Sequence, residues 1–240
     1  MEIKTEYIPT QKTARYVTYG TLSEKTEYFW FCLHGSNMLC EQMLYKFKDL
    51  NPQEHFVVAP EALNRFYADG FGGDVVASWM TSRDRLDEIN DFSNYLSNLY
   101  DHFIADLAPN CRKIILGFSQ GGTTAFRWLH HHKVEADILI GYSCWIPEDI
   151  DLKSSATALD NLSILYTYGN EDKYLTPDRI KMIKDVIGKN KLSVEIISYA
   201  GLHKIDRAHL KEMFLSYCIC LLYTSPSPRD ATLSRMPSSA

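Results

Sequence analysis

The residues Gly117-Phe118-Ser119-Gln120-Gly121 place a serine two residues from a glycine on either side, directly after an apolar run at 113–116. The run is typical of a strand and residues 123–132 of a helix, so the motif has the strand–turn–helix context of a nucleophile elbow. Such a turn crowds its flanking positions, which must lack bulky side chains. It also points the serine hydroxyl at a helix N-terminus, where backbone N–H groups can stabilise an oxyanion. The sequence therefore predicts that Ser119 is a nucleophile; the alternative is an incidental glycine-rich turn.

A serine hydroxyl needs a base within hydrogen-bond reach, and the base needs an orienting acid. In a strand–elbow–helix arrangement these partners follow the serine in the order acid, then histidine. We expect the acid to be Asp172, which follows the predicted strand 164–168 at the sheet edge where functional groups collect. Glu171 is the alternative, but the spacing from Gly169 and the helix start at Pro177 favour Asp172. Either residue could instead be a solvated loop carboxylate.

The predicted base is His203, on the loop after the predicted strand 194–199. Of the eight histidines, it alone follows the acid and lies on a strand-to-helix loop. His209 falls inside the next helix and is interpreted as a packing or surface residue. The run at 130–132 is three adjacent histidines on a helix, whose side chains point in different directions. We therefore expect a solvated helix end there and no metal site.

An oxyanion hole needs two N–H donors. The first is expected from Gln120, which follows the nucleophile. The second is expected from the loop after the predicted strand 28–33, where Gly35 permits a tight turn and Ser36 offers its backbone N–H. His34, in the same loop, is interpreted as a loop-shaping residue rather than a base.

Strand-like apolar runs alternate with helix-like stretches along the chain, which predicts one doubly wound α/β domain over residues 1–219. The expected strands are residues 15–19, 28–33, 56–59, 113–116, 137–141, 164–168 and 194–199. Several are apolar on both faces, as in a mostly parallel sheet covered by helices on both sides.

Three further helices are predicted with specific boundaries. Apolar residues spaced by three or four between 84 and 107 form one stripe, from Leu86 to Leu107, with Thr81 or Ser82 as the expected N-cap. Thr176-Pro177 predicts the N-terminus of a helix over 178–187, and a further helix is expected over 205–215.

The composition is that of an ordinary globular protein. Of 240 residues, 45% are hydrophobic and 23% charged, and the net charge of −5 argues against a nucleic-acid-binding surface. The start is charged and has no signal-peptide core, and the longest late apolar run, 214–223, is half the length of a membrane span, so no integral membrane association is expected. The six cysteines have no disulfide or metal spacing, which favours a reducing, cytoplasmic setting.

The segment 220–240 is rich in serine and proline without a period. Residues 221–230 are similar to translated adapter or vector DNA. We expect a non-native or disordered tail without chemistry, and a native C-terminus that is then missing.

Seven short motifs occur in an order that resembles one family. They are Leu33-His34-Gly35, Ala59-Pro60-Glu61, Ser78-Trp79, Gly117-Phe118-Ser119-Gln120-Gly121-Gly122, Ile146-Pro147, Gly169 with Asp172, and Gly201 with His203. Together they resemble the phospholipase/carboxylesterase branch of the α/β-hydrolase superfamily, which includes acyl-protein thioesterases. The resemblance covers residues 10–217. It implies the α/β-hydrolase fold and hydrolysis of carboxylic esters or thioesters through an acyl-enzyme, with Ser119, Asp172 and His203 as the triad and no metal or cofactor.

Two stretches depart from the family pattern. The loop continues as Ser36-Asn37-Met38 without further glycines, which leaves the second oxyanion donor open. The stretch 60–80 is long and aromatic, and predicts a pocket of its own shape. The gap 142–163 is too short for a large cap domain, so an open, shallow site is expected. Its predicted apolar walls, each of which could instead only pack a loop, are Phe66, Tyr67, Trp79, Met80, Trp145 and Ile146.

The predicted partner is a small-molecule or lipid-like ester, and the sequence carries no signal for an oligomeric state. A serine peptidase on the same triad is one alternative, because a fold does not determine a substrate. A non-catalytic binding protein of the same fold is another, although such proteins typically lose a triad member and all three are present here in order.

Overall fold

The computed structural model describes residues 2–152, 159 and 162–218. Within these residues, seven strands form one sheet in the order β1-β3-β2-β6-β7-β8-β9, and a separate hairpin pairs β4 with β5. The strands of the main sheet are β1 (Tyr16–Tyr19), β2 (Tyr28–Leu33), β3 (His55–Pro60), β6 (Arg112–Phe118), β7 (Ile138–Tyr142), β8 (Ser163–Gly169) and β9 (Val194–Tyr199). Within the seven-stranded sheet of the described residues, only β1 runs antiparallel to its neighbour. The predicted tail 220–240 lies outside the described residues.

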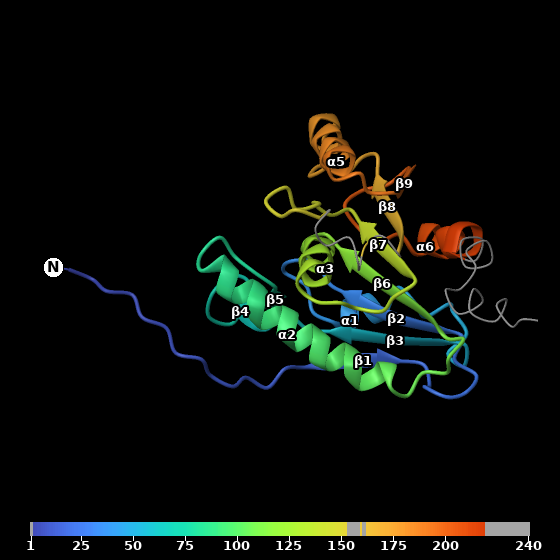
Figure 1. Ribbon diagram of the computed structural model, residues 1–240, viewed down its shortest axis with the longest axis horizontal. Coiled ribbons are helices and arrows are strands. Elements are labelled where there is room, and N and C mark those ends of the chain that lie inside the picture. Colours follow the sequence, from blue (N-terminus) through green and yellow to red (C-terminus); the bar gives the residue numbers. More distant parts are fainter. Residues whose placement is uncertain (1, 153–158, 160–161, 219–240) are drawn as a thin grey trace, which may run out of the picture.

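Helices cover both faces of the sheet, and Figure 1 shows α2 (green) and α6 (red) on opposite sides of it. The helices are α1 (Glu41–Leu44), α2 (Arg85–Ile104), α3 (Gln120–His131), α5 (Pro177–Asn190) and α6 (Arg207–Met213), with a π-helical turn η1 (Phe214–Cys218) after α6. Successive residues of a strand point to opposite faces. Phe29 and Phe31 accordingly pack with α2 and α3, whereas Trp30 and Cys32 pack with α1 and α6.

This arrangement confirms the predicted fold: a mostly parallel, doubly wound sheet with helices on both faces. The whole connection from β7 to β8 spans residues 143–162, which leaves no room for a large cap domain. In the described part of the chain, no helix combines the length and apolar character needed to cross a membrane.

The N-terminus of α2 differs from the prediction. The helix begins at Arg85, and the residue at its N-cap position, Asp84, has a left-handed backbone (φ 50°) and makes no side-chain cap. Thr81 and Ser82 both precede the N-cap position and do not cap the helix; the Thr81 hydroxyl instead accepts from the Arg83 N–H at 3.2 Å. Leu86 is 78% exposed, so the buried stripe begins one turn later, at Ile89.

The other two predicted helices begin close to where the sequence placed them. In α5, Thr176 caps the N-terminus by accepting from the Arg179 N–H, with Pro177 at the first position, as predicted. In α6, Asp206 is the N-cap and accepts from the His209 N–H at 3.0 Å. The helical stretch therefore starts two residues later than expected.

The aromatic stretch 60–80 forms a β-hairpin that the sequence reading missed. Strands β4 (Asn64–Tyr67) and β5 (Val75–Ser78) pair antiparallel around a glycine-rich turn. Phe66 and Tyr67 are about half exposed on it. The backbone of Asn37 donates to Ala77 at 3.0 Å, which ties β5 to the loop after β2.

Candidate active site

Ser119 lies on a strained turn between β6 and α3. Its backbone has φ 52° and ψ −122°, a region that residues with a side chain rarely occupy. The turn is anchored where its backbone N–H donates to the Tyr142 carbonyl of the neighbouring strand at 2.9 Å. Such strain persists only where the surroundings impose it, and here the anchored turn holds the hydroxyl at the carboxyl end of the sheet.

The glycines around Ser119 are required by close approach of the backbone. A Cβ at Gly121 would lie 2.3 Å from the carbonyl oxygen of Leu33, and one at Gly117 would lie 2.4 Å from the Cα of Gly122. Real Cβ atoms do not approach other atoms so closely. The prediction that these positions must lack side chains is confirmed, and Gly121 lets the first turn of α3 pack directly on the end of β2.

The structure brings the three predicted triad side chains together at this edge of the sheet. His203 Nε2 lies 3.0 Å from Ser119 Oγ, and His203 Nδ1 lies 2.6 Å from Asp172 Oδ2. Because a carboxylate oxygen accepts hydrogen bonds, Nδ1 carries the proton that is shared with Asp172. Nε2 therefore presents its lone pair to the serine hydroxyl, which is the tautomer that a general base requires.

Asp172 is fixed by its own loop. Its side chain has no exposed surface, and its second oxygen accepts from the Tyr174 N–H at 2.8 Å. The alternative acid, Glu171, has an exposed side chain, and its backbone N–H donates instead to the Gly201 carbonyl at 2.9 Å. That bond joins the loop of Asp172 to the loop of His203. The geometry thus favours Asp172 as the partner of the imidazole.

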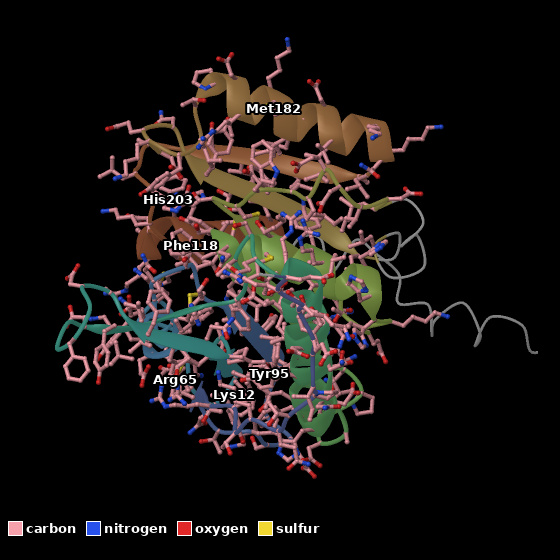
Figure 2. The ribbon with its side chains drawn as sticks, turned by 90° about the vertical axis from the view of Figure 1, so that its left-hand side faces the viewer. Lys12, Arg65, Tyr95, Phe118, Met182 and His203 are labelled. Carbon is pink, nitrogen blue, oxygen red and sulfur yellow. The ribbon has the colours of Figure 1, made fainter. Side chains whose placement is uncertain are left out.

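The imidazole of His203 is packed between two aromatic rings. Its centroid lies 5.0 Å from that of Phe118 and 4.7 Å from that of Tyr174, and the ring of Tyr174 is nearly perpendicular to it. Figure 2 shows His203 and Phe118 together at one end of the sheet, below α5. Two further tyrosines hold the loop behind the imidazole: Tyr199 Oη donates to the Lys204 carbonyl at 2.7 Å, and Tyr142 Oη accepts from the Asp206 N–H at 3.0 Å.

The two candidate oxyanion donors lie on separate segments. Gln120 is the first residue of α3, where backbone N–H groups have no intrahelical acceptor. Ser36 is exposed on the turn after β2. In the described part of the chain neither N–H donates to a protein acceptor. Both are therefore free to bind an anion, which is the property that an oxyanion hole needs.

His34 shapes the loop that carries Ser36. It is fully buried; its Nδ1 donates to the Gly35 carbonyl at 2.7 Å and its Nε2 accepts from the Ala62 N–H at 3.0 Å. Burial lowers the pKa of this imidazole, which favours the neutral form that can make both bonds. Both nitrogens are engaged, so the imidazole has no free lone pair for base chemistry.

The predicted apolar walls need correction. Trp79 and Ile146 have at most 1% exposed surface and belong to the hydrophobic core, so they do not form an exposed wall of a substrate pocket. Met80 is also nearly buried, and Trp145 is partly exposed. Phe66 and Tyr67 lie on the β4–β5 hairpin.

Tyr174 and Leu202 were missed as rim residues. They are 49% and 54% exposed and flank His203, one across its ring and one next to it in the chain. Their position beside the predicted triad residues was the signal available in the sequence.

A cavity of about 680 Å³ lies away from the triad, between the N-terminal segment and α2. Lys12 and Tyr95 line it, and Figure 2 shows both well below His203. Its lining includes neither Ser119 nor His203. The hydrogen-bonded side chains of Ser119, His203 and Asp172 thus lie outside this cavity.

One group of potential metal ligands occurs among the described residues: Cys40, Glu41 and Glu61. The guanidinium of Arg15 already lies within it, 2.8 Å from Glu61 Oε2 and 3.1 Å from Cys40 Sγ, and it also pairs with Glu41. A cation is thus supplied by the protein, and the pKa of Glu41 is lowered to about 2 chiefly by its hydrogen bond with Arg15. The cluster is an ion-pair network that ties the residue before β1 to the start of α1.

A mostly parallel sheet covered on both faces, with a serine on a sharp turn between strand and helix, defines an α/β-hydrolase. The chain belongs to the phospholipase/carboxylesterase family, whose model matches residues 43–219. It is therefore a hydrolase of the esterase and thioesterase type, and the resemblance inferred from the sequence motifs is confirmed.

Solved structures of the same fold include enzymes from plants and bacteria. Acyl-protein thioesterase 2 of Zea mays is 18% identical, with a TM-score of 0.69 over 88% of this chain and 100% of that one. SOBER1 of Arabidopsis thaliana is 18% identical, with a TM-score of 0.61 over 82% and 97%. A Bacillus cereus carboxylesterase is 11% identical, with a TM-score of 0.62 over 86% and 94%. No curated protein matches the chain.

Proposed function

We propose that this protein hydrolyses carboxylic esters or thioesters through a covalent acyl-enzyme on Ser119. The observation that carries the proposal is the continuous hydrogen-bonded chain from Ser119 Oγ through the imidazole of His203 to the buried carboxylate of Asp172. Chemistry of this kind needs a nucleophile, a base and an orienting acid in contact, and the three groups meet that requirement.

In the first half-reaction, His203 Nε2 removes the proton from Ser119 Oγ as the oxygen attacks the substrate carbonyl carbon. The carbonyl oxygen becomes an oxyanion and is bound by the N–H groups of Ser36 and Gln120. Asp172 stabilises the imidazolium that forms. The intermediate then collapses, the protonated His203 gives its proton to the leaving alcohol or thiol, and the acyl group stays on Ser119.

The second half-reaction repeats the same steps with water. His203 removes a proton from a water molecule, whose oxygen attacks the acyl carbon of the ester on Ser119. The second oxyanion occupies the same pair of N–H donors. Collapse returns the proton from His203 to Ser119 Oγ and releases the carboxylic acid, which restores the starting enzyme.

The proposed substrate is a small-molecule or lipid-like ester that reaches an open site. Tyr174 and Leu202 give the rim an apolar surface next to His203, which suits an acyl chain or an apolar leaving group. The maize and Bacillus relatives are named as an acyl-protein thioesterase and a carboxylesterase. Among the described residues, four cysteines are free and buried: Cys32, Cys40, Cys111 and Cys144. Free thiols agree with a reducing compartment such as the cytoplasm.

Replacement of the nucleophile tests the proposal. Ser119→Ala keeps the Cβ on the strained turn and removes only the hydroxyl, so the fold should remain while hydrolysis of a short p-nitrophenyl ester falls by about 10⁴-fold or more. Steady-state rates give the activity, and a thermal unfolding curve checks the fold. Turnover that survives in a folded variant would mean that another residue is the nucleophile.

Covalent labelling provides an independent check. A fluorophosphonate should label the wild type once and leave Ser119→Ala unlabelled, because the probe reacts with an activated serine. Equal labelling of the two proteins would count against Ser119. A series of p-nitrophenyl esters and matched thioesters of increasing chain length then defines the preferred acyl group and leaving group.

A further inference from the structure

The two candidate oxyanion donors belong to different segments of the chain, so the contacts that hold these segments in place set the distance between the donors. Ser36 follows β2 and Gln120 begins α3. Oxyanion donors act over a narrow range of distances, about 2.7–3.1 Å from the developing charge. A displacement of either segment by a fraction of an ångström therefore weakens the stabilisation.

The segment 78–80, which begins at the last residue of β5, bonds to both. The indole Nε1 of Trp79 donates to the His34 carbonyl at 2.8 Å, two residues before Ser36. The backbone N–H of the same Trp79 donates to Oε1 of the Gln120 side chain at 2.9 Å. One buried residue thus links the two donor-bearing segments through two different atoms.

The Gln120 side chain completes the link. Its Oε1 also accepts from Ser78 Oγ at 3.1 Å, and its Nε2 donates to the Met80 carbonyl at 2.7 Å. Both polar atoms of the Gln120 amide therefore bond to the segment 78–80. Its backbone N–H is left for the substrate.

The His34 carbonyl is held from a second side. A Cβ at Gly121 would lie 2.5 Å from this oxygen, so the first turn of α3 is in direct contact with it. The carbonyl therefore lies between Gly121 and the indole of Trp79. Two further backbone bonds pair Asn37 and Met38 with Ala77 at 3.0 and 3.1 Å, so the chain is also held on the C-terminal side of Ser36.

We infer that Trp79, together with the side chain of Gln120, is a positioning residue that sets the separation of the Ser36 and Gln120 N–H donors in the oxyanion hole. The inference rests on the proposed function and adds a role for the segment 78–80 at the end of β5. Trp79 does not touch substrate, since it has only 1% exposed surface. It acts through the two peptide groups that bind the oxyanion.

The test compares Trp79→Phe with a matched control, Trp128→Phe. Trp128 is also fully buried and its Nε1 also donates one hydrogen bond, to Ser97 Oγ at 2.9 Å, but in the core between α2 and α3. Each variant loses one indole N–H and part of a ring, so both should lose stability. Only Trp79→Phe releases the segment that carries Ser36.

The expected result is a loss of about tenfold or more in kcat for Trp79→Phe with KM little changed, because the lost interaction is made in the transition state. Rates are expressed per active site, counted by end-point fluorophosphonate labelling, so that misfolded protein does not contribute. Trp128→Phe should keep the wild-type kcat per labelled site. Equal kcat per site in Trp79→Phe and the wild type would overturn the inference.

A second variant covers the case in which Trp79→Phe does not fold. Gln120→Glu keeps the backbone N–H and the acceptor for Trp79, but sets an oxygen against the Met80 carbonyl. It should show the same loss in kcat, and a wild-type kcat per site would contradict the inference. Failure of the proposed function is a separate outcome, since it would appear as label or turnover in Ser119→Ala.

Discussion

Tyr142 joins the nucleophile to the base through two of its atoms. Its carbonyl accepts from the Ser119 N–H at 2.9 Å, and its hydroxyl accepts from the Asp206 N–H at 3.0 Å, three residues after His203. Burial and a hydrogen bond with Tyr199 raise the pKa of the phenol well above its usual value, so the hydroxyl stays neutral. Tyr142 thereby fixes the turn of Ser119 and the loop of His203 relative to each other.

Tyr142→Phe should lower kcat several-fold and the free energy of unfolding by about 1–3 kcal/mol, because the Asp206 N–H loses its acceptor. The matched control is Tyr166→Phe on β8, which removes a buried hydroxyl that donates at 2.7 Å to the carbonyl of Cys144, two residues after β7. Steady-state kinetics and urea unfolding measure the two effects. A kcat in Tyr142→Phe no lower than in Tyr166→Phe would contradict a role in holding His203.

At the scale of the elements, the placement of α3 against β2 decides whether the site forms. Gly121 allows the helix to contact the Leu33 and His34 carbonyls, where a Cβ would lie 2.3 and 2.5 Å from the two oxygens. The helix cannot keep this position with any side chain at residue 121. Gly188 in α5 is different, since a Cβ there would have no atom within 4 Å.

Gly121→Ala should therefore destabilise the protein and reduce activity, because α3 must move away from β2 and carry Gln120 with it. Gly188→Ala should raise the free energy of unfolding by up to about 1 kcal/mol and leave kcat unchanged, as expected for alanine in a helix. Chemical denaturation and ester hydrolysis of the two variants give the comparison. A Gly121→Ala protein with wild-type stability and rate would refute the close approach of α3.

At the scale of the whole molecule, stability should depend on pH through His55. This residue at the start of β3 is buried, accepts a hydrogen bond from Trp30 Nε1 at 3.0 Å, and is packed by Tyr28 and Phe214. Burial lowers its pKa to about 4, against a smaller opposing effect of Glu54.

The folded state binds fewer protons than the unfolded state between pH 6.5 and about 4, so stability falls as the pH falls through this window. This difference in the pKa of His55 between the unfolded and folded states corresponds to roughly 3 kcal/mol in the free energy of unfolding. His55→Asn keeps an acceptor for Trp30 and removes the titration, so its unfolding free energy should change less over that range. Urea unfolding at a series of pH values checks this, and equal pH dependence in the two proteins would exclude His55 as the source.

The sequence predicted the parts of the structure that local pattern encodes. The strands of the main sheet are short apolar runs, and the elbow needs small residues at fixed positions around Ser119, so both are readable without coordinates. Asp172 and His203 follow from their places after β8 and β9.

What the sequence did not predict depends on contacts between distant segments. The apolar residues of the β4–β5 hairpin are irregularly spaced in the sequence. Its pairing is stabilised in part by the loop at Asn37. Trp79 was predicted to be a pocket wall because no residue near it in the sequence indicates that its indole N–H donates to the His34 carbonyl. The cap of α2 was misplaced because the Thr81 hydroxyl bonds within its own turn.

The most direct test of covalent catalysis by Ser119 is to trap the acyl-enzyme. The protein is mixed with excess p-nitrophenyl ester, quenched in acid during the first turnovers, and analysed by intact and peptide mass spectrometry. If Ser119 is the nucleophile, the protein gains the mass of one acyl group, located on the peptide that contains Ser119. Hydrolysis at the normal rate with no adduct, or with the adduct on another residue, would contradict it.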